Sequence, residues 1–158
     1  MPVFISHRSS DDATAKRVRD LLVSLRVNCY LDDLDEGLRT TDDIAAVIQR
    51  RLSQCTHLLA VVSQATTTSW WVPFEIGMGT ATDIRITSYR VGYVSLPQYL
   101  TKWPVLSTEN DLQQYGRLYN QDGKILLVVK GQRIEASRSV IQKAEDFHRE
   151  LKRALGQI

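Results

Sequence analysis

The sequence is poor in the features that mark secreted, membrane-spanning and nucleic-acid-binding proteins. Cysteine occurs only twice among 158 residues: Cys29 stands in an apolar alternation, and Cys55 follows a helix-like stretch. We therefore expect two buried free thiols in a reducing compartment instead of a disulfide framework. No apolar run reaches the roughly 20 residues that a bilayer-spanning helix needs. The formal net charge of +2 is too small to predict binding along a phosphate backbone.

Targeting and metal-binding patterns are also missing. Met1 is followed directly by Pro-Val-Phe-Ile-Ser, which is typical of a strand and lacks the regions of a secretory signal. We therefore expect a soluble protein of the cytoplasm. The three histidines, His7, His57 and His148, show no ligand spacing with either cysteine, so we expect no metal site.

The composition is that of an ordinary globular domain, with 43% hydrophobic and 24% charged residues, and its length fits one core. Short apolar runs alternate with stretches whose apolar residues recur at helical spacing. The runs predict strands at residues 3–6, 27–31, 57–63, 84–91 and 124–130. The periodic stretches predict helices at residues 11–25, 44–52, 70–80, 111–120 and 140–155, with an irregular segment at 96–110.

Alternating strands and helices favour a mostly parallel sheet with right-handed crossovers. The apolar run His57–Ser63 is typical of a strand buried on both faces of such a sheet. Ligands of open parallel sheets bind beyond the carboxyl ends of the strands. The residues expected at those ends are Ser6, His7 and Arg8 after the first strand, Asp32 and Asp33 after the second, and Ser63 and Trp70–Glu75 after the third. We therefore expect a cation, several carboxylates and an aromatic platform on one rim.

Glu75 differs from the other rim residues because its neighbours are apolar. It follows Trp71 by four residues, so the two side chains share one face of a helix. A carboxylate in such a setting is costly unless it is solvated in a cleft or paired. The residues alone leave two interpretations open: a carboxylate that takes part in chemistry, and a rim carboxylate paired with an arginine such as Arg8.

Other sites fit the sequence less well. The pair Asp32–Asp33 suggests a metal or phospho-acceptor site, but a receiver domain needs its aspartate after the third strand, where this chain has Ser63. The segment Gly77–Gly79 lacks the third glycine of a dinucleotide fingerprint, since Thr82 stands there, and we interpret it as allowing close helix packing. No Walker A sequence and no nucleophile elbow occur. Basic residues of the last third predict a solvated helix face, with a partner surface as the alternative.

Four segments in order resemble the motifs of TIR (Toll/interleukin-1 receptor) domains. They are Phe4–His7, Tyr30–Asp33 with the acidic loop that runs on to Asp43-Ile44, His57–Ser63, and Ser69–Ile76. The last resembles the segment that carries the catalytic glutamate of NAD-cleaving TIR domains. The resemblance implies an α/β fold, a flavodoxin-like three-layer sandwich with a central, mostly parallel sheet. It also implies a TIR core at residues 1–121 and an addition at 122–158, a strand and an amphipathic helix packed on the same domain.

NAD-cleaving TIR domains break the bond between nicotinamide and ribose, so the resemblance implies NAD+ as a substrate and no cofactor. Some members release ADP-ribose, and others form a cyclic isomer of it. The roles carried over are catalysis for Glu75 and substrate binding for His7, Arg8, Asp32, Asp33 and Trp71. Cleavage of this kind develops oxocarbenium charge on the ribose, which a nearby carboxylate can stabilise.

The resemblance extends to stand-alone bacterial TIR proteins such as Thoeris anti-phage sensors, whose nucleotide product is read by a separate effector protein. It implies self-association through TIR surfaces and the BB loop, residues 33–42, with no nucleic-acid or membrane partner. Two departures are visible: that loop lacks the Pro-Gly pair of many adaptor TIR domains, and His7 stands where tyrosine is common. A non-catalytic interaction module is the main alternative, and a nucleoside-processing enzyme of similar topology is another.

Overall fold

A computed structural model describes the backbone of residues 2–31, 44–82, 84–129 and 136–158, and their side chains outside residues 123–143. A parallel sheet of five strands forms its centre, in the order β2-β1-β3-β4-β5. The strands are β1 (Val3–Ser6), β2 (Cys29–Leu31), β3 (His57–Val62), β4 (Arg85–Arg90) and β5 (Val105–Leu106). This order is that of flavodoxin-like doubly wound sheets, and it confirms the predicted fold class.

The most apolar strands, β1 and β3, lie in the middle of the sheet, where helices cover both faces. Every residue of β1 and β3 is buried, as expected for uninterrupted apolar runs in a parallel sheet. The register pairs Val3 with His57 and Ser6 with Ala60, so β3 continues past the end of β1. Ser6 is the last residue of β1, paired with β3 and directly below the rim.

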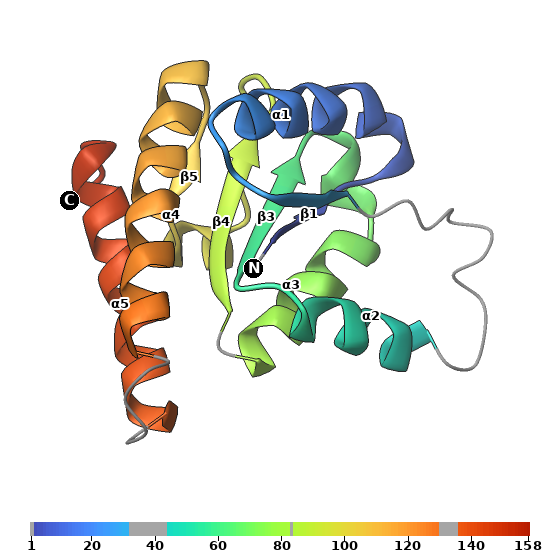
Figure 1. The fold of residues 1–158 in the computed structure, drawn as a ribbon. Coiled ribbons are helices and arrows are strands. Elements are labelled where there is room, and N and C mark those ends of the chain that lie inside the picture. The colour runs from blue at the N-terminus through green and yellow to red at the C-terminus, as the bar shows by residue number, and fades with distance from the viewer. Residues whose placement is uncertain (1, 32–43, 83, 130–135) are drawn as a thin grey trace.

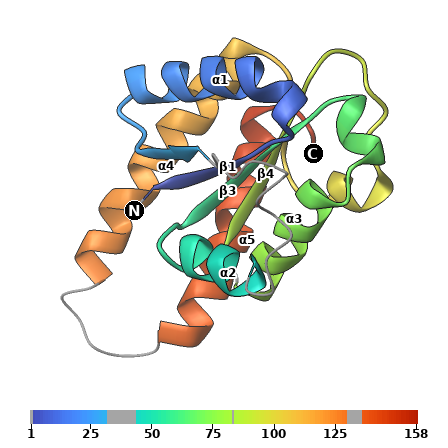
Figure 2. The ribbon, with the colours of Figure 1, turned by 90° about the vertical axis from the view of Figure 1, so that its right-hand side faces the viewer.

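The helices cover the two faces of the sheet in separate layers, which can be followed in Figures 1 and 2. One layer holds α1 (Asp12–Ser24), α4 (Glu109–Val129) and α5 (Ala136–Ala154). The other layer holds α2 (Ile44–Ser53), α3 (Trp71–Ala81) and the 3-10 segment η4 (Gln98–Lys102). None of the helices in the described part of the chain combines the length and apolarity needed to cross a membrane.

The predicted strand at residues 124–130 is wrong, because α4 continues as a helix to Val129. A short apolar run has no period that separates a strand from a buried helical segment. Extending an existing helix adds one hydrogen bond for each residue fixed, so the turns that precede this run favour helix within it. The fifth strand lies earlier, at Val105–Leu106, inside the segment that was expected to be irregular.

The C-terminal helix α5 is connected to the sheet through polar side chains. His148 Nε2 accepts a hydrogen bond from the backbone N–H of Ile86 on β4, at 3.0 Å. Beyond the helix, the side chain of Gln157 accepts from the N–H of Val105 at 3.1 Å and donates to its carbonyl. Since β5 lies at the edge of the sheet, Gln157 occupies hydrogen-bonding positions that a further strand would otherwise take.

A buried charged cluster lies at the amino-terminal ends of β3 and β4. Arg85 Nε lies 2.6 Å from Asp122 Oδ2, and His57 Nε2 lies 3.8 Å from the same oxygen. Burial, followed by the charge of Arg85, lowers the pKa of His57 well below its ordinary value, so this imidazole is neutral. Because ligands bind such sheets at the opposite ends of the strands, we assign the cluster to packing of α4.

Candidate active site

The strand order creates a topological switch point between β1 and β3. The chain leaves β1 through α1 on one face and leaves β3 through α3 on the other face. The segments that follow the two strands therefore diverge, and crevices of this kind bind the ligands of doubly wound sheets. Ser6 ends β1 and Val62 ends β3, so the candidate site is built from the residues just after them.

Glu75 lies in the second turn of α3, and 0% of its surface is exposed. The helix begins at Trp71, whose backbone N–H lies 3.2 Å from Ser69 Oγ, and Pro73 occupies its first turn, where a missing N–H costs no hydrogen bond. The hydroxyl of Ser6 donates a hydrogen bond to Glu75 Oε2. This contact connects the end of β1 with α3 across 69 residues of sequence.

Arg8 connects the segment after β1 with the segment after β3. Its guanidinium donates to the carbonyl of Ala65 at 2.6 Å and lies 3.4 Å from Thr68 Oγ1. Both acceptors belong to the 3-10 segment η3 (Ala65–Thr68), which leads into α3. The half-buried guanidinium of Arg8 therefore supplies positive charge at the rim where Glu75 is anchored.

A second link between these segments centres on Asp11. Its Oδ2 accepts a hydrogen bond from Ser63 Oγ at 2.7 Å, and Thr66 Oγ1 lies 3.4 Å away. All three side chains are buried, so their bonds act in a low-dielectric setting and hold the rim rigid. Ser63 was expected at the rim, whereas Asp11 was expected only as the first residue of a helix. The sequence signal for this contact is an acidic residue just past the first strand together with hydroxyl side chains just past the third.

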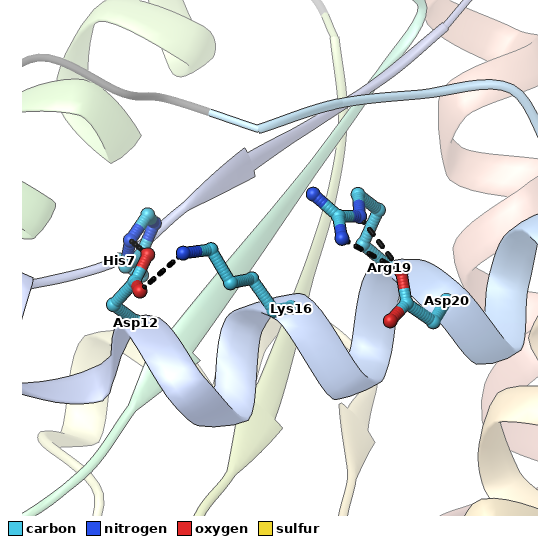
Figure 3. A network of polar contacts seen from close by, with 5 residues as sticks. All are labelled: His7, Asp12, Lys16, Arg19 and Asp20. Carbon is cyan, nitrogen blue, oxygen red and sulfur yellow. Dashed lines mark hydrogen bonds and ion pairs between the residues drawn. The ribbon is translucent and has the colours of Figure 1, made fainter.

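His7 contacts the first residue of α1. It is buried, with 4% of its surface exposed, and its Nε2 lies 3.5 Å from Asp12 Oδ1. Asp12 also forms an ion pair with Lys16 at 2.8 Å, one helical turn later (Figure 3). The hydrogen bond from Lys16 is the largest cause that lowers the pKa of Asp12. His7 is therefore oriented by a carboxylate of α1.

The tryptophan pair divides between core and surface. Trp71 has 1% of its surface exposed and packs in the core, whereas Trp70 has 63% exposed. Their rings meet edge to face with centroids 5.3 Å apart. The resemblance to TIR domains implied substrate binding for Trp71, which shares a helix face with Glu75. In the structure, the ring that solvent reaches is that of its neighbour.

The remaining predicted site residues lie outside the described part of the chain. These are Asp32 and Asp33, together with the BB loop at residues 33–42. Among the residues that the structure describes, no group of three or more His, Cys, Asp or Glu side chains has a geometry that could hold a metal ion.

A cleft of about 390 Å³ lies in the layer that holds α2, α3 and η4, at the place where α3 meets η3 and η4. Its walls are mostly apolar and include Val72 and Ile76 of α3, with Tyr99 and Trp103 from the η4 region. Glu75 is not among the residues that line it. This cleft was not expected from the sequence, because η4 lies in the segment predicted to be irregular.

The fold and the rim define a doubly wound α/β domain with a buried carboxylate at its switch point. The sequence profile of the family described as TIR domain matches residues 3–122. Because this match covers most of the chain, the chain belongs to the TIR domain family. A search of curated proteins gives no match.

Two solved structures of one receptor show the same fold. A metazoan TIR-STING receptor from C. gigas is similar, with a TM-score of 0.56 and 22% identity, over 71% of this chain and 38% of the receptor chain. Its complex with 2′,3′-cGAMP gives a TM-score of 0.52 at 22% identity, over 71% and 38% of the two chains. The TIR domains of the activated Roq1 resistosome give 0.47 at 14% identity, over 96% of this chain and 83% of that chain. The chain thus spans well under half of the receptor.

Proposed function

We propose that this TIR domain cleaves NAD+ at the bond between nicotinamide and ribose, releasing nicotinamide and either ADP-ribose or a cyclic ADP-ribose isomer. The observation that carries the proposal is the position of Glu75, a carboxylate with 0% exposure that accepts a hydrogen bond from Ser6 beside the switch point. Burying a carboxylate among apolar residues is unfavourable, and such groups gather at functional sites. NAD+ is the substrate, and the reaction needs no further cofactor.

The chemistry requires little more than a fixed negative charge near the ribose. As the bond between the ribose C1′ and the nicotinamide nitrogen breaks, its electron pair neutralises the cationic ring, so the leaving group needs no proton. Positive charge then develops on the ribose, and the Glu75 carboxylate stabilises it. Attack by water at C1′ gives ADP-ribose and releases a proton, whereas attack by another atom of the same molecule gives a cyclic isomer.

The proposed substrate-binding residues are His7, Arg8, Asp32, Asp33 and Trp71. Arg8 has the strongest structural support, because its guanidinium is already oriented by the Ala65 carbonyl and suits a pyrophosphate. Trp71 and Glu75 are buried, so a substrate can contact them only after the side chains that cover them move. We propose that self-association through TIR surfaces and the BB loop, residues 33–42, accompanies this opening.

The biological setting is also part of the proposal. A TIR domain that makes a small nucleotide product suits a signalling role, and we propose bacterial anti-phage defence of the Thoeris type in the cytoplasm. A separate effector protein would read the product. Infecting cells that carry the chain with phage, and following nucleotide products by mass spectrometry, tests this setting independently of the chemistry.

Replacing the carboxylate tests the chemistry directly. We expect the protein to release nicotinamide from NAD+, and Glu75→Gln to reduce the rate by at least about a hundredfold, because the amide carries no charge. Chromatography of the products, over a series of protein concentrations, measures both the rate and the linear or cyclic outcome. Nicotinamide release that is unchanged in Glu75→Gln would contradict the assigned role.

The burial of Glu75 and Trp71 also favours a second function, a TIR interaction module without turnover. In that case the two side chains serve only the packing of α3. This alternative predicts self-association with no nicotinamide release at any protein concentration. Size-exclusion chromatography and the turnover assay on the same samples separate the two functions.

A further inference from the structure

The Glu75 carboxylate needs a partner because its own helix supplies an apolar environment. Trp71, Val72 and Ile76 of α3 each have only 1–2% of their surface exposed. A carboxylate among such residues has lost water and requires hydrogen-bond donors in its place. The hydroxyl of Ser6 is such a donor, and it is itself fully buried.

We propose that Ser6 is the positioning residue of Glu75: its hydroxyl holds Oε2 in place and keeps the carboxylate ionised for substrate cleavage. The inference rests on the function proposed above. In this role Ser6 acts on the catalytic carboxylate without contacting NAD+. Its contact with Glu75 cannot be found from sequence spacing.

The sheet makes Ser6 a rigid support. Ser6 is the last residue of β1, pairs with Ala60 of β3 and has 0% of its surface exposed. Residues Val3–Ile5 of the strand are paired with β2, and Val3–Ser6 are paired with β3. A donor on a doubly paired strand has little freedom to move, so it can fix the carboxylate of a helix that packs above it.

The hydrogen bond has a chemical consequence that a purely structural contact would lack. A donor that bonds the charged form of an acid makes proton uptake less favourable. Without the Ser6 hydroxyl, the Glu75 carboxylate takes up a proton at a higher pH and loses the charge that stabilises the ribose. Because this stabilisation belongs to the transition state, kcat falls while KM changes little.

The variant Ser6→Ala tests the proposal, with Ser88→Ala as its matched control. Ser88 is also a fully buried serine on a central strand, but its Oγ has no hydrogen-bond partner among the residues that the structure describes. Nicotinamide release from NAD+ is measured between pH 4.5 and 8 for both variants and the wild type. The carboxyl resonance of Glu75, assigned by its loss in Glu75→Gln, is followed by 13C NMR over the same range.

We expect Ser6→Ala to move the acid limb of the pH–rate profile and the carboxyl titration upward by about one pH unit. We also expect its kcat to fall on the order of tenfold, with KM nearly unchanged. Ser88→Ala should retain the wild-type midpoints. If Ser6→Ala does not fold, Ser6→Cys carries the test, because a weaker thiol donor should give a smaller shift of the same sign.

Titration midpoints in Ser6→Ala that coincide with those of the wild type would overturn the inference. An equal shift in Ser88→Ala would do so too, because it would trace the effect to general loosening of the sheet. Failure of the proposed function has a different signature: no NAD+ cleavage by the wild type, or full activity in Glu75→Gln. The NMR titration then still reports whether Ser6 controls the protonation of Glu75.

Discussion

Burial controls the chemistry of individual side chains in this domain, and the two cysteines show it outside the candidate site. Both are free thiols, as the sequence predicts; Cys55 is buried and Cys29 half-buried. Burial raises the pKa of Cys29 to about 12 and that of Cys55 to about 11. The thiolate is the reactive form of cysteine, so neither side chain is suited to nucleophilic or redox chemistry.

The thiols should therefore react slowly in the folded protein. At pH 8 we expect Ellman's reagent to label Cys29 and Cys55 at rates at least about a hundredfold below those in 6 M guanidinium chloride. Stopped-flow absorbance measures both rates, and Cys55→Ser separates the two sites. Rapid labelling of either thiol in the native state would show that its surroundings open far more readily than its burial indicates.

At the same scale, Glu75 illustrates what spacing can and cannot reveal. Its position one turn after Trp71, beyond a buried strand, made it a candidate, but the residues alone left open whether it takes part in chemistry or forms an ion pair at the rim. Its partner Ser6 lies 69 residues away and became visible only when β1 and α3 were packed together. The same holds for Asp11, whose carboxylate accepts a hydrogen bond from Ser63. This bond joins the segment after β1 to the residue that follows β3.

Among the elements, α3 must lie close to the sheet for Glu75 to reach Ser6. Gly79 allows this approach, because a Cβ built there would lie 2.9 Å from both Ile84 Cγ2 and Leu58 Cδ2. Gly77 has no neighbouring atom within 4 Å of its ideal Cβ. The interpretation of this glycine pair as packing residues is therefore confirmed for Gly79 and wrong for Gly77.

The two glycines form a matched pair for a stability test. We expect Gly79→Ala to lower the free energy of unfolding by about 1–3 kcal/mol, because the added methyl group forces buried side chains to move. We expect Gly77→Ala to raise it by roughly 0.5–1 kcal/mol, since alanine favours the helix and meets nothing. Urea unfolding measures both; equal effects of the two substitutions would contradict close packing at Gly79.

The second half of α4 is an element whose type was predicted wrongly from the sequence. An Ile-Leu-Leu-Val-Val run between polar segments satisfies the criteria for a buried strand, and β3 shows that the criteria work elsewhere. At Val129 the chain is instead still helical. Local composition could not decide between these outcomes, because a buried helix and a buried strand use the same apolar residues.

At the scale of the whole molecule, the packing of the C-terminal helix against the sheet involves two histidines that are neutral in the folded protein. Burial is the largest cause that lowers the pKa of His148 to about 4, and nearby positive charges such as Arg85 add to it. Neutral His148 accepts the hydrogen bond from Ile86 that connects α5 with β4. His57 is held neutral in the same way, also chiefly by burial.

A histidine whose pKa is lowered by folding makes stability depend on pH in a defined direction. The unfolded chain takes up the proton near pH 6.5 and the folded chain only near pH 4. The contribution of neutral His148 to the free energy of unfolding is therefore fully present above pH 6.5 and is lost as the pH falls from 6.5 to 4. For His148 the loss reaches about 3 kcal/mol at pH 4. Carboxylates also titrate in this range, so only a comparison with a variant isolates the histidine.

The comparison uses His148→Gln, which keeps an acceptor for the Ile86 N–H and does not titrate. We expect the free energy of unfolding of the wild type to fall more steeply than that of the variant from pH 6.5 to pH 4. Urea unfolding at each pH gives the two curves. Parallel curves would mean that His148 is protonated in the folded state as easily as in the unfolded one.

The sequence by itself determined the class of this protein: apolar runs that alternate with helical periods require a parallel sheet between two layers of helices. It also predicted a polar rim beyond the ends of these strands and made Glu75 a candidate there, from its spacing after Trp71 and from the resemblance to TIR domains. The tertiary structure decided which groups meet across long separations. Three contacts show this: Ser6 with Glu75, Asp11 with Ser63, and His148 with Ile86 of β4. They join segments whose distance in sequence carries no signal, and only packing brings them together.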